Sequence, residues 1–343
     1  MILEALSLTN FRNHSHLDLE LPRPGMPLYI SGPNGAGKTS IIEAIYMLFT
    51  LRTFRGQPLS DIKSFGSEFL RISGIFAPND SDVESAVLFY QNERKFLINN
   101  QTDYLSAADY SYITPVICYS PSFETILSSE HSERRQSIDR IIYYTDKFHM
   151  QRVKHYNILM QRKRAELDNE KPDKTVLSII NEQLIPVSDE ISSARLNLIE
   201  EINRSIKNFP EMSTVMMPDT ELSLSVSSLQ GKDLGNELDR QRPLYGSHKD
   251  LLYVKKNGKI IEKFQSFGQK KSCLLLLLYH MALIVQKSRK SDILLLCDDF
   301  EAGLDDIRAA EVKKLIALLM ENTQVLLTGI SNKHYTQAEE LKL

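Results

Sequence analysis

Short stretches that alternate apolar and polar residues, or are wholly apolar, recur along the 343-residue chain and predict β-strands. Residues 16–21 alternate strictly, as a half-exposed strand does, whereas 27–31 and 292–299 are apolar runs typical of buried strands. A polar turn at 91–93 indicates a β-meander, and Asn257 with Gly258 predicts a type I′ hairpin turn. The expected strands are 2–8, 16–21, 27–31, 68–76, 83–90, 94–98, 113–119, 221–227, 252–256, 259–262, 292–299 and 324–328.

A second set of segments places apolar residues at helical spacing. From about residue 129 to 209 glycine is absent, charges are frequent, and Ile138, Ile141 and Ile142 follow the i, i+3, i+4 pattern. Further helices are expected at 40–48, 271–286 and 307–321. The chain is therefore expected to be an α/β protein in three parts, with one α/β lobe formed by 1–128 and 216–343 and a helical lobe inserted at 129–215.

The most specific motif lies between an expected strand and an expected helix. Residues 32–39 read Gly-Pro-Asn-Gly-Ala-Gly-Lys-Thr, which fits the phosphate-binding P-loop pattern in its required strand–loop–helix context. Glycines let successive N–H groups face one point at a helix N-terminus, which attracts an anion. Lys38 would reach the β- and γ-phosphates of a nucleotide, and the Thr39 hydroxyl would bind Mg²⁺. The residues expected around the phosphates are Gly32, Asn34, Gly35, Gly37, Lys38 and Thr39.

Two carboxylates, Asp298 and Asp299, follow directly after an apolar run. An apolar strand that ends in Asp is where P-loop ATPases hold Mg²⁺, so Asp298 is expected to share the metal with Thr39. An Asp-Asp turn without function is the alternative, which the upstream P-loop disfavours. Arg12 lies between the first two expected strands, either solvated or above the nucleotide. Arg52 and Arg55 could face a triphosphate or a path for DNA, and the sequence leaves both possibilities open.

The charge balance excludes a globally basic surface, because 41 Lys and Arg residues face 44 Asp and Glu residues, a net charge of -3. Any nucleic-acid binding therefore needs a local patch. The densest cations of the helical segment form either a solvated helix face, as most charge runs do, or a contact with a phosphate backbone, which their few acidic neighbours support. These cations are Arg152, Lys154, Arg162, Lys163 and Arg164.

Cysteine usage and hydropathy favour a cytoplasmic protein without a membrane segment. Cys118, Cys273 and Cys297 lie in apolar runs at no metal-ligand spacing, as buried thiols in a reducing compartment do. The N-terminal residues lack a basic signal-peptide region, and the longest apolar run, 274–278, is far shorter than a membrane span.

Four elements occur in a fixed order, at residues 32–39, 266–269, 294–299 and 304–305. Together they resemble the Walker A, signature, Walker B and D-loop motifs of ABC-type ATPase heads, with the signature written Ser-Phe-Gly-Gln. The resemblance implies an α/β fold of the ABC-type P-loop ATPase head, with a mixed sheet, a β-meander and the inserted helical lobe. It also implies ATP and Mg²⁺ as cofactors.

More narrowly, the chain resembles the RecF family of bacterial recombination mediators, which belongs to the SMC-like group. Residues 246–251 read Gly-Ser-His-Lys-Asp-Leu where this family usually has Gly-Pro-His-Arg-Asp-Asp, and Lys270 and Lys271 replace Gln-Arg after the signature. The stretches that carry the likeness are 10–13, 32–39 with 43–46, 52–55, 119–121, 133–135 with Asp139, 161–162 and 246–250.

The resemblance implies an ATP-dependent homodimer that is a slow, DNA-dependent ATPase. Ser266 and Gly268 of one subunit would close over the γ-phosphate at Lys38 of the other, with DNA bound in the cleft of the closed dimer. Asp299 would orient the attacking water. Gln269 and Asp305 complete the set of residues expected at the nucleotide. The family also implies action at single-strand gaps with RecO, RecR and RecA, where it helps to load RecA onto DNA coated with SSB.

Two other functions compete with this interpretation. A transporter ATPase subunit is disfavoured by the long helical insertion, by the absence of a membrane segment, and by Thr328 at the position expected for a transporter's H-loop histidine. A RecF-like ATPase of a non-repair, defence system would work with a separate effector, because the chain carries no nuclease constellation. A co-purifying partner would distinguish this second possibility.

Overall fold

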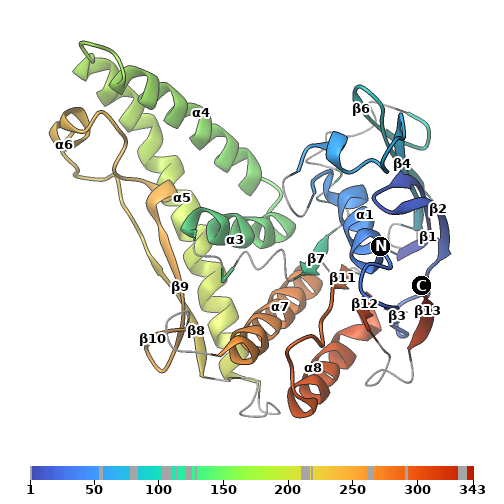
Figure 1. Cartoon of the computed structure of the whole chain (residues 1–343). Helices are drawn as coiled ribbons and strands as arrows, with labels where there is room; N and C mark the ends of the chain where they lie inside the picture. Colours follow the sequence, from blue (N-terminus) through green and yellow to red (C-terminus); the bar gives the residue numbers. More distant parts are fainter. Residues whose placement is uncertain are drawn as a thin grey trace. The chain divides into compact units, whose positions relative to one another are not determined.

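The computed structural model describes residues 2–53, 57–77, 84–101, 110, 112, 115–120, 126–127, 130–209, 217, 219–261, 266–289, 293–330 and 338–343 (Figure 1). The chain forms two compact units by its internal contacts. Unit 1 comprises residues 1–124, 212–217 and 266–343. Unit 2 comprises residues 125–211 and 218–265.

Unit 1 contains a five-stranded parallel sheet with the order β13-β3-β12-β11-β7. The P-loop follows one of these strands and Asp298 follows another. Four of the sheet's strands are buried along their whole length, as their continuous apolar runs require. Because the strands are parallel, the segments that follow β3, β7, β11 and β12 meet at one edge of the sheet. The strands are β3 (Leu28–Ser31), β7 (Val116–Tyr119), β11 (Ile293–Cys297), β12 (Thr323–Gly329) and β13 (Glu339–Lys342).

Strand β13 was not predicted from the sequence. It reads Glu-Glu-Leu-Lys and is mostly exposed, so it has neither the apolar run nor the β-branched residues that indicate a strand. Backbone pairing with β3 holds it at the edge of the sheet, where the Leu343 amide also donates to the Ser31 carbonyl at 2.9 Å. Its charged side chains are typical of an edge strand.

An antiparallel sheet with the order β2-β1-β4-β5-β6 forms the second layer of unit 1, and β4, β5 and β6 make the predicted meander. Strands β1 and β2 extend further than expected, because pairing continues to Phe11 and His14 and leaves only Arg12 and Asn13 in the turn. The strands are β1 (Ile2–Phe11), β2 (His14–Glu20), β4 (Leu70–Ala77), β5 (Glu84–Tyr90) and β6 (Arg94–Ile98).

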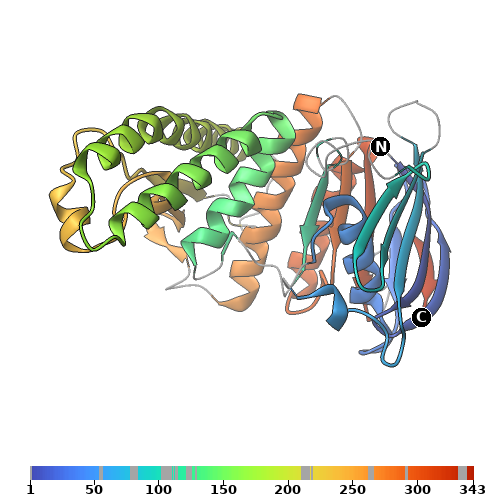
Figure 2. The same ribbon diagram turned by 90° about the horizontal axis from the view of Figure 1, so that it is seen from above.

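Helix α1 (Lys38–Thr50) lies between the two sheets, with contacts to β1, β4 and β5 on one side and to β7, β11 and β12 on the other (Figure 2). Its residues 41–50 are all buried, as expected for a helix that is apolar around most of its circumference. Helix α7 (Phe267–Arg289) packs on β7 and β11 and against α8 (Asp306–Leu319). Unit 1 therefore has the expected α/β architecture of an ATPase head.

Unit 2 contains the predicted helices together with a three-stranded sheet of order β10-β9-β8. Asn257 and Gly258 both have positive φ, as the predicted type I′ turn between β9 and β10 requires. The helices are α3 (His131–Thr145), α4 (His149–Leu167), α5 (Lys174–Lys207) and α6 (Gly235–Asp239). The strands are β8 (Thr220–Ser225), β9 (Leu251–Lys256) and β10 (Lys259–Ile260). Unit 2 also has the short 3₁₀ turn η3 (Ser247–Lys249), and unit 1 has η1 (Leu59–Asp61) and η5 (Met320–Asn322).

The grouping of β8, β9 and β10 with the helices differs from the expected division at residue 216, which assigned these strands to the second part of the α/β lobe. Their contacts explain the grouping, since α5 packs on β8 and α3 packs on β9. How many independently folding domains the chain has remains a prediction.

Candidate nucleotide-binding site

The P-loop follows β3 and packs against the turn between β1 and β2. Gly35 and Gly37 have backbone φ values of 86° and 104°, which residues other than glycine rarely adopt. A Cβ atom on Gly37 would lie 2.3 Å from His14 Nε2, so only glycine fits there. Asn13 Nδ2 donates to the Gly35 carbonyl at 3.3 Å, and His14 Nε2 lies 3.1 Å from the Gly37 carbonyl. The β1–β2 turn therefore supports the loop from outside.

Lys38 begins helix α1 and is buried inside the loop. Its Nζ donates to the carbonyl oxygens of Gly32 at 2.9 Å and Pro33 at 3.0 Å. An ammonium group at a helix N-terminus concentrates positive charge where the backbone amides already attract an anion. The loop thus presents positive charge of the kind that could hold phosphate groups.

Asp298 brings together three strand ends. Its Oδ1 accepts from Thr39 Oγ1 at 3.0 Å and from Thr328 Oγ1 at 2.8 Å, while Oδ2 accepts from Ser120 Oγ at 3.1 Å. Burial raises the pKa of Asp298, and these hydroxyl donors act against that rise. A carboxylate beside a hydroxyl is a donor set that suits Mg²⁺, so Thr39 and Asp298 fit the metal that P-loop chemistry requires.

The peptide of Asp299 is held on both sides. Asp299 has a left-handed backbone with φ 44°, which is uncommon for a residue other than glycine. Its N–H donates to Thr328 Oγ1 at 2.8 Å, and its carbonyl accepts from Lys271 Nζ at 2.9 Å. Lys271 is buried and also donates to the Ala302 carbonyl at 2.7 Å. Thr328 and Lys271 therefore fix the direction of the turn that carries Asp299.

Arg12 forms an ion pair on the outer side of this region. Its Nε and Nη2 donate to the two carboxylate oxygens of Glu43, each at 3.0 Å, and Nη2 also donates to Gln57 Oε1 at 2.7 Å. Of residues 12–14, it is Asn13 and His14 whose contacts with the loop are described, while the described partners of Arg12 are Glu43 and Gln57. Arg52 is exposed, and Arg55 lies outside the described residues.

The signature residues lie at the start of α7. Ser266 is exposed, and its N–H donates to Gln269 Oε1 at 2.9 Å. Phe267 is also exposed, and a Cβ on Gly268 would lie 3.1 Å from the Gly303 carbonyl in the turn before α8. Asp305 caps α8, because its Oδ1 accepts from the Arg308 amide at 2.8 Å. The signature and D-loop residues thus share an accessible part of unit 1.

The cations predicted to contact DNA differ in their surroundings. Lys154, Arg162 and Arg164 are exposed on α4. Arg152 pairs with Asp146 at 2.7 Å and with Glu190 at 3.2 Å. Lys163 is a correction to the predicted cluster: its side chain is 0% exposed and pairs with Glu237 at 2.6 Å, so it faces the interior of unit 2.

Sequence reasoning missed Ser120, Lys271 and His14, and it considered Thr328 only as a substitute for histidine. Ser120 follows β7, and Thr328 lies near the end of β12, on either side of Asp298 in the parallel sheet. The sequence could have indicated Ser120 and Thr328 only through the rule that the carboxyl ends of parallel strands meet.

Among the described residues no group of three or more His, Cys, Asp or Glu side chains could hold a metal, and no helix could cross a membrane.

The two sheets of unit 1, with the P-loop, the buried Asp298 and helix α7, define the class of ABC-type P-loop ATPase heads. The family model described as the RecF/RecN/SMC N-terminal domain matches residues 2–342, so the chain belongs to this family. The predicted likeness to RecF of the SMC-like group is confirmed by its relatives.

Two of these relatives are DNA replication and repair proteins RecF. The protein of Rickettsia massiliae is 27% identical over 361 residues, covering 100% of this chain and 99% of the relative. That of Rickettsia felis is 28% identical over 327 residues, covering 90% and 88%.

Solved structures show the same fold. The recombination mediator protein RecF bound to an ATP analogue, in the RecFOR pathway, has a TM-score of 0.82 at 22% identity and covers 100% of this chain and 96% of its own. An Smc head bound to the C-terminal winged-helix domain of ScpA has a TM-score of 0.63 at 14% identity, covering 100% and 94%.

Proposed function

We propose that this protein is an ATP-dependent, dimerising, DNA-binding ATPase of recombinational repair. It acts in the cytoplasm at single-strand gaps and, with RecR and RecO, helps to load RecA onto DNA coated with SSB. The observation that carries the proposal is the meeting of Lys38, Thr39 and Asp298 at one sheet edge, in a chain whose family match spans residues 2–342. Full-length similarity to RecF proteins supplies the biological setting.

ATP binding follows from the chemistry of the loop. Lys38 exchanges its two carbonyl partners for phosphate oxygens, and the loop amides donate to the same phosphates. Thr39 and Asp298 would hold Mg²⁺, which would neutralise phosphate charge. The other loop residues proposed to surround the phosphates are Gly32, Asn34, Gly35 and Gly37. Arg12, which pairs with Glu43, is proposed to contribute to nucleotide binding from the β1–β2 turn.

Dimerisation uses the exposed start of α7. Ser266 and Gly268 of one subunit cover the nucleotide at Lys38 of the other, with Gln269 and Asp305 at the edge of the same interface. Supporting this arrangement, Ser266 and Phe267 are accessible in the single chain, and the Ser266 hydroxyl lies at a helix N-terminus, which favours contact with a phosphate.

Asp299 accepts a hydrogen bond from the attacking water and orients it. A short carboxylate on a fixed turn suits slow hydrolysis, since Asp reaches one methylene less far than Glu. Thr328 acts as a positioning residue, because it binds both the Asp298 carboxylate and the Asp299 amide.

Thr328→Val tests this positioning role with an isosteric change, and Thr328→Ser is the matched control that keeps the hydroxyl. Val leaves the Asp299 amide without its partner, so stability should fall by about 1–3 kcal/mol. ATP turnover should fall about tenfold or more, because small displacements of a reacting geometry have large effects on rate, whereas ATP affinity should change little. Turnover, calorimetric ATP binding and thermal unfolding check these outcomes. Equal turnover of the Val and Ser variants would contradict the role of Thr328.

The function as a whole is tested by measuring DNA binding with and without ATP. The full chain should bind gapped DNA at least about tenfold more tightly with ATP and Mg²⁺ than without nucleotide, because the closed dimer forms the DNA cleft. Single-stranded and duplex DNA provide the comparison, and the slope of affinity against log salt counts the phosphates contacted. Arg152, Lys154, Arg162 and Arg164 are the α4 cations proposed to contribute. Equal DNA affinity with and without ATP would contradict the proposal.

A further inference from the structure

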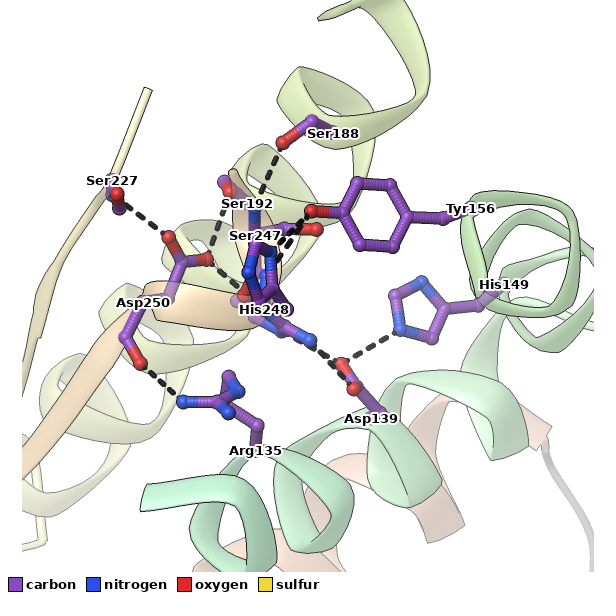
Figure 3. A network of polar contacts seen from close by, with 11 residues as sticks. Arg135, Asp139, His149, Tyr156, Ser188, Ser192, Ser227, Ser247, His248 and Asp250 are labelled. Carbon is purple, nitrogen blue, oxygen red and sulfur yellow. Dashed lines mark hydrogen bonds and ion pairs between the residues drawn. The ribbon is translucent and has the colours of Figure 1, made fainter. Parts of the chain in front are cut away.

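The segment 246–250 of unit 2, which the ATPase mechanism leaves without a role, is anchored by buried hydrogen bonds (Figure 3). Asp250 is fully buried, and its Oδ2 accepts from Ser192 Oγ at 2.8 Å and from Arg195 Nη1 at 2.9 Å. Its Oδ1 accepts from the Ser227 amide at 2.9 Å. The carbonyl of Asp250 accepts from Arg135 Nη1 at 2.7 Å. Side chains of α3 and α5 and a backbone amide of the segment after β8 thus fix one end of the segment.

Arg195 on α5 is the centre of this network. It donates to both carboxylate oxygens of Asp139 on α3, each at 2.8 Å, and to the Ser247 carbonyl at 2.7 Å. His149 Nε2 lies 3.0 Å from Asp139 Oδ1. Burying one guanidinium between two carboxylates requires nearly complete hydrogen bonding, and such networks fix a single geometry. The segment is therefore rigidly held between α3, α4 and α5.

His248 is the residue that this rigid segment orients. Gly246 packs so closely on α4 that a Cβ there would lie 2.3 Å from the Tyr156 hydroxyl oxygen. That hydroxyl lies 2.8 Å from His248 Nδ1 and 3.5 Å from the His248 amide. The amide can only donate, so the hydroxyl accepts from it, and the hydroxyl proton is available to Nδ1. In the tautomer in which the hydroxyl donates to Nδ1, the imidazole carries its proton on Nε2, which is then a hydrogen-bond donor.

The charges of four cationic side chains act on this imidazole. Lys249 and Arg164 are exposed, and Arg135 is half-buried. Burial, with the charges of Lys249, Arg164, Arg135 and Lys163, lowers the pKa of His248 to about 3. His248 is thus a neutral donor in a positive field at neutral pH. Such a field favours an anion, and a neutral N–H can bind that anion without adding a further charge to the cluster.

We propose that His248, Lys249 and Arg164 form a binding site for backbone phosphates of a nucleic acid. The inference rests on the proposed DNA-binding function and extends it from α4, because residues 248 and 249 of the fixed segment join Arg164 of α4. A phosphate receives the Nε2–H of His248 and ionic contacts from the two exposed cations. These contacts position the backbone without reading the base sequence.

Charge reversal in the full chain tests the site. Lys249→Glu and Arg164→Glu should each weaken binding of a gapped duplex at least about tenfold at 0.1 M salt and lower the salt slope by about one. Lys207→Glu is the matched control, because Lys207 is exposed on α5 about 18 Å along the helix from Arg195. ATP affinity should stay at the parental value in all three. Variants that bind DNA as the Lys207 control does would overturn the proposal.

Tyr156→Phe distinguishes the contribution of His248 to DNA binding from that of the cations, because it removes only the hydroxyl that contacts the imidazole. It should weaken DNA binding about threefold, as expected for one hydrogen bond. Parental affinity in this variant would overturn the role of His248.

Competition with inorganic phosphate tests whether the site instead binds free phosphate. DNA binding should decline no faster with phosphate than with chloride of equal ionic strength, and selective competition by phosphate would overturn the nucleic-acid assignment. If the parental chain itself fails to bind DNA with ATP, the proposed function fails instead.

Discussion

Lys38→Ala is expected to abolish ATP binding while leaving the fold in place. The Nζ of Lys38 bonds only to the loop carbonyls of Gly32 and Pro33 among its described contacts, so its loss removes the cation from the phosphate site without opening the core. Isothermal titration with ATP and Mg²⁺ should show affinity reduced about a hundredfold or more, since a charge-assisted contact to phosphate contributes about 1.5–3 kcal/mol and the ammonium reaches two phosphates.

Lys314→Ala is the matched control, because Lys314 is an exposed lysine of the same unit that pairs with Glu311 on the surface of α8. It should bind ATP as the parental chain does. Thermal unfolding of the Lys38 variant should stay close to that of the control. ATP binding by Lys38→Ala at the parental affinity would contradict the proposal that the P-loop binds ATP.

Local sequence patterns predicted the strand, loop and helix at residues 27–48, which the structure has as β3 and α1. The loop at 32–39, the apolar strand before Asp298 and the Asn257–Gly258 turn depend on neighbours along the chain, where backbone preferences act directly. The likeness to ABC-type heads then predicted the class of fold, which the structural neighbours confirm.

The features that sequence reasoning missed depend on distant partners. Ser120 and Thr328 meet Asp298 only because β7, β11 and β12 pair in one parallel register. A cluster of cations on α4 gives no sign that Lys163 turns inward, since its partner Glu237 is 74 residues away in sequence. The charged edge strand β13 is formed by pairing with β3 rather than by its own residues.

Ser266→Arg is expected to leave ATP binding of the single chain nearly intact and to prevent ATP-dependent dimerisation. Lys38, Thr39 and the loop amides are all unchanged, so the phosphates keep their partners in the same chain. In the closed dimer a guanidinium at residue 266 would clash with the facing P-loop and replace the small hydroxyl donor. DNA binding and hydrolysis should then be lost together, because both belong to the closed dimer.

Mixing Ser266→Arg with Lys38→Ala sharpens this expectation. A heterodimer of the two has one intact composite site, formed by the Lys38 side of the first chain and the Ser266 side of the second. Partial ATPase activity should reappear in the mixture, while each variant alone stays inactive. A mixture as inactive as its components would count against sites shared between subunits.

Sedimentation velocity with ATP and Mg²⁺ tests the central claim most directly, because it reports assembly without relying on DNA or turnover. The parental chain should shift from monomer to dimer when nucleotide is added, and Ser266→Arg should remain a monomer at the same concentration despite binding ATP. A Ser266→Arg dimer that forms with ATP at the parental concentration would contradict a signature loop that acts on the nucleotide of the other subunit.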